Sequence, residues 1–127
     1  MIIERPTIPN VQTRDGQTIV PFGDSIVLTR ANHKVRVNKG IFIKMLYDYV
    51  EEIRNSPNVA MDNQPEKRFV FSSGETWAFV LHEGEYSLQF STPTQTNQIF
   101  FEYRFPRRNL EGFLKRLLET EGEKWIR

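Results

Sequence analysis

Two stretches of the chain carry apolar residues at the spacing of an α-helix. In the first, apolar side chains recur at positions 42, 45, 46, 49, 50 and 53, which places them on one helical face. Asn38 is suited to cap this helix, and Asn55-Ser56-Pro57 is suited to end it. In the second, positions 110, 113, 114, 117 and 118 repeat the spacing, with Pro106 suited to the first turn and Gly122 to the end. The sequence therefore predicts two helices.

Between the helices the apolar period changes from about 3.6 to 2, which is typical of half-buried strands. The alternating segments are 67–72, 76–82, 85–91 and 98–105. Ser73-Gly74 and Glu83-Gly84 are tight-turn signals. Shorter alternating segments at 18–20, 25–29 and 34–38 precede the first helix. The expected fold is α+β, with antiparallel sheets, two helices and the order β-β-β-α-β-β-β-β-α.

The length of 127 residues predicts one domain. Within it we expect an extended N-terminal arm at 1–14, a mobile loop between half-domains at 56–66 and a tail at 123–127. An apolar–Arg–apolar strand end precedes both helices, as Val35-Arg36-Val37 and as Tyr103-Arg104-Phe105. This recurrence indicates a degenerate duplication of a strands-plus-helix unit.

The amino-acid composition and the motifs present limit the kinds of functional site that the chain can form. The absence of cysteine excludes a disulfide scaffold and a thiolate site, and together with the absence of a signal-like start it favours an intracellular protein. The sequence has no phosphate loop, nucleophile elbow or metal-binding helix motif. His82-Glu83-Gly84-Glu85 places an imidazole near two carboxylates, but a solvated turn explains this pattern better than a metal site. We therefore expect a non-enzymatic protein without cofactor or metal.

The formal net charge of +1 conceals a strongly uneven distribution. Residues 25–47 contain five basic residues and no acidic one. A second basic group follows the last strand, and both groups lie where a strand meets a helix. Cations that follow phosphates, combined with an exposed ring that stacks on bases, suit single-stranded nucleic acid. The candidate residues are Arg30, Lys34, Arg36, Lys39, Phe100, Arg104, Arg107 and Arg108. If the halves lie side by side, Arg36 and Arg104 share a face or rim.

A curved antiparallel sheet that ends in a helix, with Lys39-Gly40 at a strand–helix junction, resembles the PC4-like and Whirly-type single-stranded nucleic-acid-binding proteins. The PUR-repeat proteins have a similar unit of four strands and a helix. The resemblance covers most of residues 15–120 in element order. It implies binding of single-stranded DNA or RNA on an exposed sheet face, a role as a transcription or replication cofactor, and homo-oligomers.

A protein-interaction module is the alternative hypothesis: an adaptor, inhibitor or assembly subunit. Trp125 and Ile126 near the C-terminus are the candidate anchor, since Trp is favoured at interface hot spots; the competing explanation is that they pack on their own domain. The second sheet face, with Val70, Ala78, Val80 and Phe100, is suited to a homodimer. No segment approaches the length of a membrane span, so no membrane partner is expected.

Overall fold

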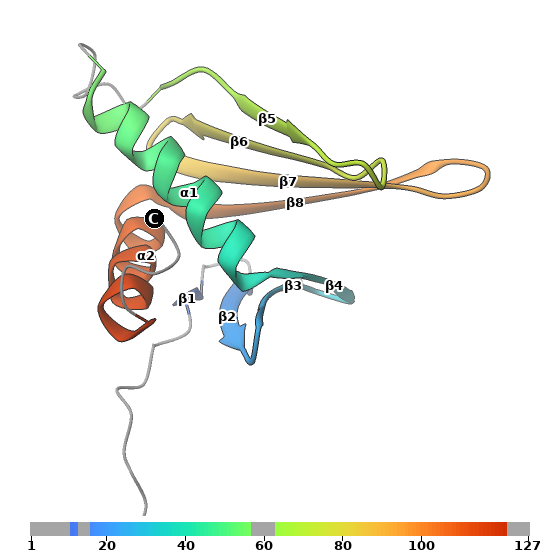
Figure 1. Ribbon diagram of the computed structural model, residues 1–127, viewed down its shortest axis with the longest axis horizontal. Coiled ribbons are helices and arrows are strands. Elements are labelled where there is room, and N and C mark those ends of the chain that lie inside the picture. Colours follow the sequence, from blue (N-terminus) through green and yellow to red (C-terminus); the bar gives the residue numbers. More distant parts are fainter. Residues whose placement is uncertain (1–10, 13–15, 57–62, 122–127) are drawn as a thin grey trace, which may run out of the picture.

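A computed structural model describes residues 11–12, 16–56 and 63–121. Two antiparallel sheets, each with strands in chain order, are each followed by a helix (Figure 1). The first unit consists of β1 (Val11–Gln12), β2 (Thr18–Phe22), β3 (Ser25–Arg30), β4 (His33–Asn38) and α1 (Lys39–Arg54). The second consists of β5 (Lys67–Val70), β6 (Thr76–His82), β7 (Glu85–Pro93), β8 (Gln98–Pro106) and α2 (Arg107–Glu121).

This arrangement confirms the predicted α+β fold and adds one short strand. Val11–Gln12 was expected to belong to an extended arm, but it pairs with β2, with Val11 opposite Ile19. Each helix is thus preceded by four strands, which form a meander in both sheets. The predicted order is thereby extended by one two-residue edge strand, formed where the end of the expected arm pairs with β2.

The helix boundaries follow from local hydrogen bonds. Asn38 caps α1, since its side-chain oxygen accepts from the Ile41 N–H at 2.9 Å. Pro106 is the last residue of β8 and does not lie in the first turn of α2, as the sequence suggested. The reason is register: Pro106 still pairs with Glu85, and the next N–H, of Arg107, donates to the Gly84 carbonyl at 2.8 Å. The start of α2 is thereby fixed to the turn between β6 and β7.

The helix of the first unit packs on the sheet of the second. The Phe42 ring of α1 lies 6.4 Å from that of Trp77 and 6.0 Å from that of Phe79. The Tyr49 hydroxyl accepts from the Leu81 N–H and donates to the Pro65 carbonyl, both at 2.9 Å. Buried residues of both units form one core cluster. The units are therefore interlocked, and neither has a core of its own.

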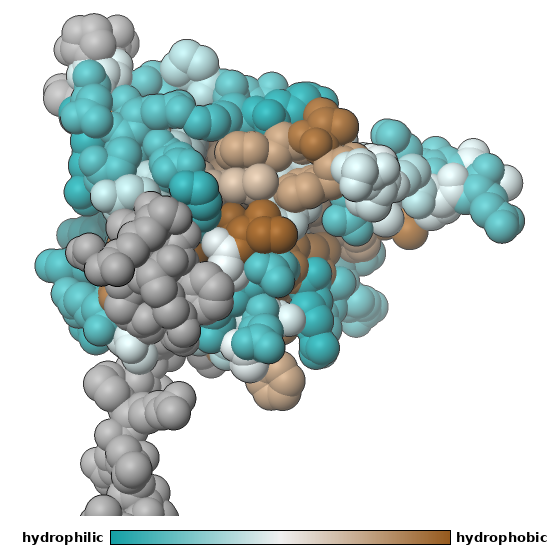
Figure 2. Space-filling view, viewed as in Figure 1, coloured by the Kyte–Doolittle hydropathy of each residue, from teal (hydrophilic) through white to brown (hydrophobic). Residues whose placement is uncertain are grey.

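The second sheet leaves part of its apolar inner face accessible. Figure 2 shows apolar side chains gathering where this sheet passes beside α1. Phe69 and Phe71, at β5, pack on Phe79 and Trp77 with ring centroids 5.5 and 4.6 Å apart, and both remain only half-buried. Within the described part of the chain, no helix is long and apolar enough to cross a membrane.

The two sheets meet where the first sheet caps the free edge of β8. The Arg104 N–H donates to the side-chain oxygen of the buried Gln17 at 2.6 Å. The Arg30 guanidinium donates to the Glu102 carbonyl at 3.2 Å. Both bonds satisfy backbone groups that an edge strand would otherwise expose. They also bring the end of the β3–β4 hairpin against the second sheet, and this contact forms the candidate site.

Candidate nucleic-acid interface

Two neighbouring hollows lie between the β3–β4 hairpin and the second sheet. The first, here named the turn hollow, has a volume of about 420 Å³. Its lining residues are Arg30, Ala31, His33, Phe100, Phe101, Glu102 and Tyr103. The second, the strand hollow, has a volume of about 190 Å³. It is lined by Lys34, Val35, Arg36 and Val37 on one side and by Glu75, Trp77, Phe90, Ser91, Thr92 and Phe101 on the other. Phe101 lines both hollows, so they adjoin, and basic and aromatic residues line them together with Glu75 and Glu102.

The turn hollow brings together predicted residues from opposite halves of the chain. Arg30 ends β3 and Phe100 lies on β8, where 60% of its surface is exposed. The hydrogen bond to the Glu102 carbonyl orients the Arg30 guanidinium, and no ion pair offsets its charge within the described residues. Arg30 and Phe100 therefore line the same hollow, and the Phe100 side chain lies on the face of β8 that also carries Glu102 and Arg104.

His33 belongs to this hollow as well. It pairs with Arg30 across the hairpin, and its ring meets that of Phe101 edge-on at 5.4 Å. It is the first residue of β4, and its side chain is exposed. Its position follows from the tight turn before it, in which Ala31 adopts a φ of 51°, a left-handed conformation that is uncommon for a residue with a Cβ.

Tyr103 supplies a buried polar group to the same hollow. Only 1% of its surface is exposed, and its hydroxyl has no hydrogen-bond partner among the described residues. Burial raises the pKa of this hydroxyl, and the nearby charge of Arg30 partly opposes the rise. Unpaired buried hydroxyls are rare in native proteins because the lost hydration is not replaced.

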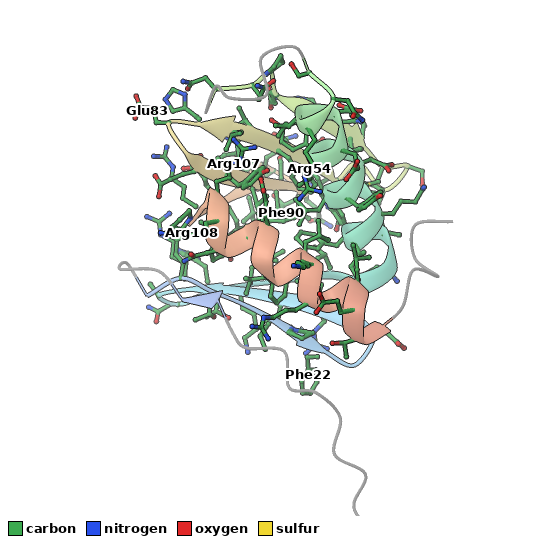
Figure 3. The ribbon with its side chains drawn as sticks, turned by 90° about the vertical axis from the view of Figure 1, so that its left-hand side faces the viewer. Phe22, Arg54, Glu83, Phe90, Arg107 and Arg108 are labelled. Atoms are coloured by element: carbon green, nitrogen blue, oxygen red, sulfur yellow. The ribbon has the colours of Figure 1, made fainter. Side chains whose placement is uncertain are left out.

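Lys34 and Arg36 lie on β4 with exposed side chains, whereas Val35 and Val37 between them pack toward the core. Neither cation has an ion pair within the part of the chain that the structure describes. The Arg36 guanidinium lies 5.7 Å from the centre of the Phe22 ring. That ring is 65% exposed and projects from the first sheet away from the helices (Figure 3).

Phe22 is a candidate stacking residue that the sequence reasoning missed. The strand was expected to end at Val20, but it continues to Phe22. Alternation from Val20 would have placed Phe22 on the same face as Arg36, because Val20, Val27 and Arg36 are neighbours in the sheet. The alternation was a usable signal, although Pro21 interrupts it with a residue that cannot donate to a strand ladder.

The other predicted basic residues are placed less favourably. Arg104 lies in the second sheet and Arg36 in the first, so the two do not share a sheet face. The Arg104 guanidinium is paired with Glu102 at 3.2 Å, and that of Arg107 with Glu111 at 2.9 Å. Lys39 is buried, with 8% exposed, which leaves little of it accessible to a phosphate. The expectation of an accessible phosphate ligand at this position is wrong, because the strand–helix junction packs inward.

Arg108 is exposed in the first turn of α2 (Figure 3) and lines neither hollow. Trp125 and Ile126, the proposed protein-interface anchor, lie outside the described residues. The predicted set thus separates: Arg30, Lys34, Arg36 and Phe100 line the two hollows, and the remaining members do not.

The outer face of the second sheet has a different character. A hollow of about 160 Å³ there is lined by Val80, His82, Glu83, Glu85, Ser87, Gln89, Glu102 and Arg104. The Glu102 carboxylate accepts from the Ser87 hydroxyl at 2.8 Å and from the Gln89 amide at 3.3 Å, besides its pairing with Arg104. In the described chain, no group of three His, Asp or Glu side chains is arranged to hold a metal ion. This face is internally hydrogen-bonded and rich in carboxylates, which repel phosphate.

The largest hollow, about 540 Å³, lies between the helices and contains none of the predicted residues. Its lining residues are Tyr47, Val50, Glu51, Arg54, Glu111, Gly112, Leu114, Lys115, Leu118 and Glu119. Charges of both signs occur around an apolar floor, so its composition points to no particular ligand.

Comparisons with known proteins leave the family open. No family model matches the sequence, and no curated protein matches it. Among solved structures, the chain is similar to the crystal structure of a protein of unknown function from the DUF155 family of Prochlorococcus sp. NATL2A. The similarity covers 84% of this chain and 96% of that chain, with 11% sequence identity and a TM-score of 0.43. A likeness this distant supports no functional argument.

Proposed function

We propose that this protein binds single-stranded nucleic acid, DNA or RNA, without catalysing a reaction on it. One observation carries the proposal: Arg30 and Phe100, from opposite halves of the chain, line one hollow together with His33. The adjoining strand hollow adds Lys34 and Arg36.

The chemistry of the two hollows fits a polyanion with aromatic bases. Three cations without carboxylate partners in the described residues follow one hairpin, where they can replace the counterions of successive phosphates. Exposed rings stack on bases regardless of base identity, which suits binding with little sequence preference. The Phe22 ring beneath Arg36 extends this surface onto the first sheet.

A single strand fits better than a duplex. Phe100 lines a hollow at the edge of the second sheet, and only an unpaired base can leave its stack to reach it. The roles expected from the family resemblance, a transcription or replication cofactor and a homo-oligomer, remain predictions that depend on this activity.

A salt titration with a matched pair of variants tests the proposal. Fluorescence anisotropy of a labelled, unstructured thymidine oligonucleotide would be followed from low to high salt. We expect affinity to fall steeply, with each phosphate contact contributing about 0.7 to the log–log slope. Arg30→Glu should weaken binding about 10-fold or more and reduce the slope, because it reverses a charge without a carboxylate partner in the described chain.

Arg104→Glu is the matched control, since it makes the same charge change at an arginine that is already paired with Glu102. Its effect should be several-fold smaller. Absence of binding at low salt to both DNA and RNA single strands would refute the proposal and favour the protein-interaction module. Equal losses from the two variants would show that net charge matters, and not the turn hollow.

A further inference from the structure

β8 leaves a short part of its backbone edge open beside the turn hollow. The pairing of β7 with β8 is continuous from Glu85–Pro106 to Pro93–Gln98, so alternate residues of β8 direct their N–H and C=O groups away from β7. Glu102 and Arg104 belong to this outward set, since their backbone groups bond to Arg30 and Gln17. Phe100 lies two residues before Glu102 in β8 and therefore belongs to the same outward set. Its backbone N–H and C=O therefore face the open edge, without a hydrogen-bond partner in the described residues.

The open edge is too short to accept another strand. On one side the first sheet already caps it at Glu102 and Arg104. On the other, β8 begins at Gln98, whose N–H is bonded to the Asn97 side chain at 2.9 Å. Among the described residues between these limits, Phe100 is the one whose N–H and C=O both lack a hydrogen-bond partner, since Glu102 uses its C=O and Gln98 its N–H. An added β-strand requires several consecutive residues, whereas one small planar ligand requires a single donor–acceptor pair.

The groups around this point suit an unpaired nucleobase. An extended residue presents its N–H and C=O side by side, and each nucleobase carries an adjacent donor and acceptor on its Watson–Crick edge. The Phe100 and His33 rings offer faces for stacking, and Arg30 can meet the adjoining phosphate.

We propose that the turn hollow seats one unpaired base of the bound strand, with its edge hydrogen-bonded to the backbone of Phe100. The inference depends on the proposed single-strand binding and specifies how that binding recognises bases. The volume of about 420 Å³ lies in the range of small-molecule sites, and a base with its sugar can occupy it. Because all four bases offer the required pair, recognition is of an unpaired base and not of a sequence.

The test compares two oligonucleotides of equal length and charge, one with bases throughout and one with a central run of abasic residues. We expect the abasic strand to bind roughly 10-fold more weakly, with the same salt slope because the phosphates are unchanged. Equal affinities with a steep salt slope would overturn the inference and leave the proposed function standing. Failure of both strands to bind would refute the proposed function itself.

Variants at Phe100 separate the ring from the backbone. Phe100→Ala removes the ring and keeps the N–H, whereas Phe100→Pro also removes an N–H that β7 does not use. We expect the proline variant to lose roughly a further threefold in affinity for the strand with bases and nothing for the abasic strand. Val70→Ala, at a 74% exposed apolar residue in the same row of the sheet, is the control and should bind normally. Equal binding by the alanine and proline variants would exclude the backbone contact; if proline prevents folding, the abasic comparison decides.

Discussion

The β3–β4 hairpin and the outer face of the second sheet have the same local architecture and opposite electrostatics. Both belong to four-stranded meanders that lead into a helix. On the hairpin, Lys34 and Arg36 have no carboxylate partner among the described residues, and an exposed ring lies below Arg36. On the second sheet, Arg104 pairs with Glu102, and Arg68 pairs with Glu66.

The number of basic residues in a segment is therefore a weak guide to which surface has cations available to bind an anion. Arg36 and Arg104 hold equivalent places in sequence, each between two apolar residues before a helix. They differ because Glu102 precedes Arg104 on the same face of β8, where it also engages Ser87 and Gln89. The Glu102 carboxylate thus makes Arg104 part of an internally hydrogen-bonded network, whereas Arg36 has no carboxylate partner among the described residues.

The variant with the largest expected effect tests whether the two structural units unfold as one cooperative domain. Phe42→Ala removes a fully buried α1 ring that packs on Trp77 and Phe79 of the other unit. We expect a loss of about 3–5 kcal/mol in the free energy of unfolding. Urea unfolding followed by circular dichroism and by tryptophan fluorescence should give one shared transition. Two separate transitions would show that the units fold independently.

The comparison itself is tested by two double variants with equal charge change. Lys34→Glu/Arg36→Glu should weaken binding of a single strand about 30-fold, or about 2 kcal/mol, because two available cations become repulsive. Arg68→Glu/Arg104→Glu alters two arginines that already have carboxylate partners, and should cost about threefold or less. Anisotropy at fixed salt measures both. A reversed order would place the strand on the second sheet.

Two buried tyrosines allow the turn hollow to be compared with the core. Tyr49→Phe leaves the Leu81 N–H and the Pro65 carbonyl without their shared hydroxyl, so we expect a loss of about 1–3 kcal/mol. Tyr103→Phe removes a hydroxyl with no described partner and should be neutral or stabilising by up to about 1 kcal/mol. Thermal and urea unfolding measure both; a large loss from Tyr103→Phe would mean that its hydroxyl is satisfied within the protein.

The variant with the smallest expected effect reduces the difference in charge between the hairpin and the outer face of the second sheet. Glu102→Gln removes the carboxylate charge but keeps an oxygen that can accept from Ser87 and Gln89. Arg104 then becomes available to a phosphate, and we expect binding to strengthen about two- to threefold with a slightly steeper salt slope. Unfolding measurements provide the control for altered stability. Unchanged affinity would show that the strand does not approach this face.

Much of the fold could be predicted from local pattern. The spacing of apolar residues after Asn38 and before Gly122 identified both helices, since one apolar face of a helix repeats every 3.6 residues. Alternation identified the strands of the second sheet and assigned Phe79 and Phe105 to the core, where both are fully buried. Val11–Gln12 was missed as a strand because a two-residue pairing leaves no period to detect.

The candidate site could be predicted only in part. Charge counts identified Arg30, Lys34 and Arg36, and alternation identified Phe100 as an exposed ring. The same reasoning also included Lys39, which is buried, and Arg104, which is paired. Burial and pairing at these positions depend on residues that are distant in sequence or on another strand, so local pattern does not reveal them.

The sequence by itself determined the secondary structure, the apolar faces and the basic segment, because each depends on neighbours within a few residues. Only the tertiary structure shows that the units interlock and that Arg30, at the end of β3, caps the β8 edge at Glu102. As a result, Arg30 and Phe100 line one hollow. These outcomes depend on contacts between segments far apart in the chain. Such contacts form because exposed strand edges and unpaired apolar faces must be covered in the folded state, and many different pairs of segments can meet that need.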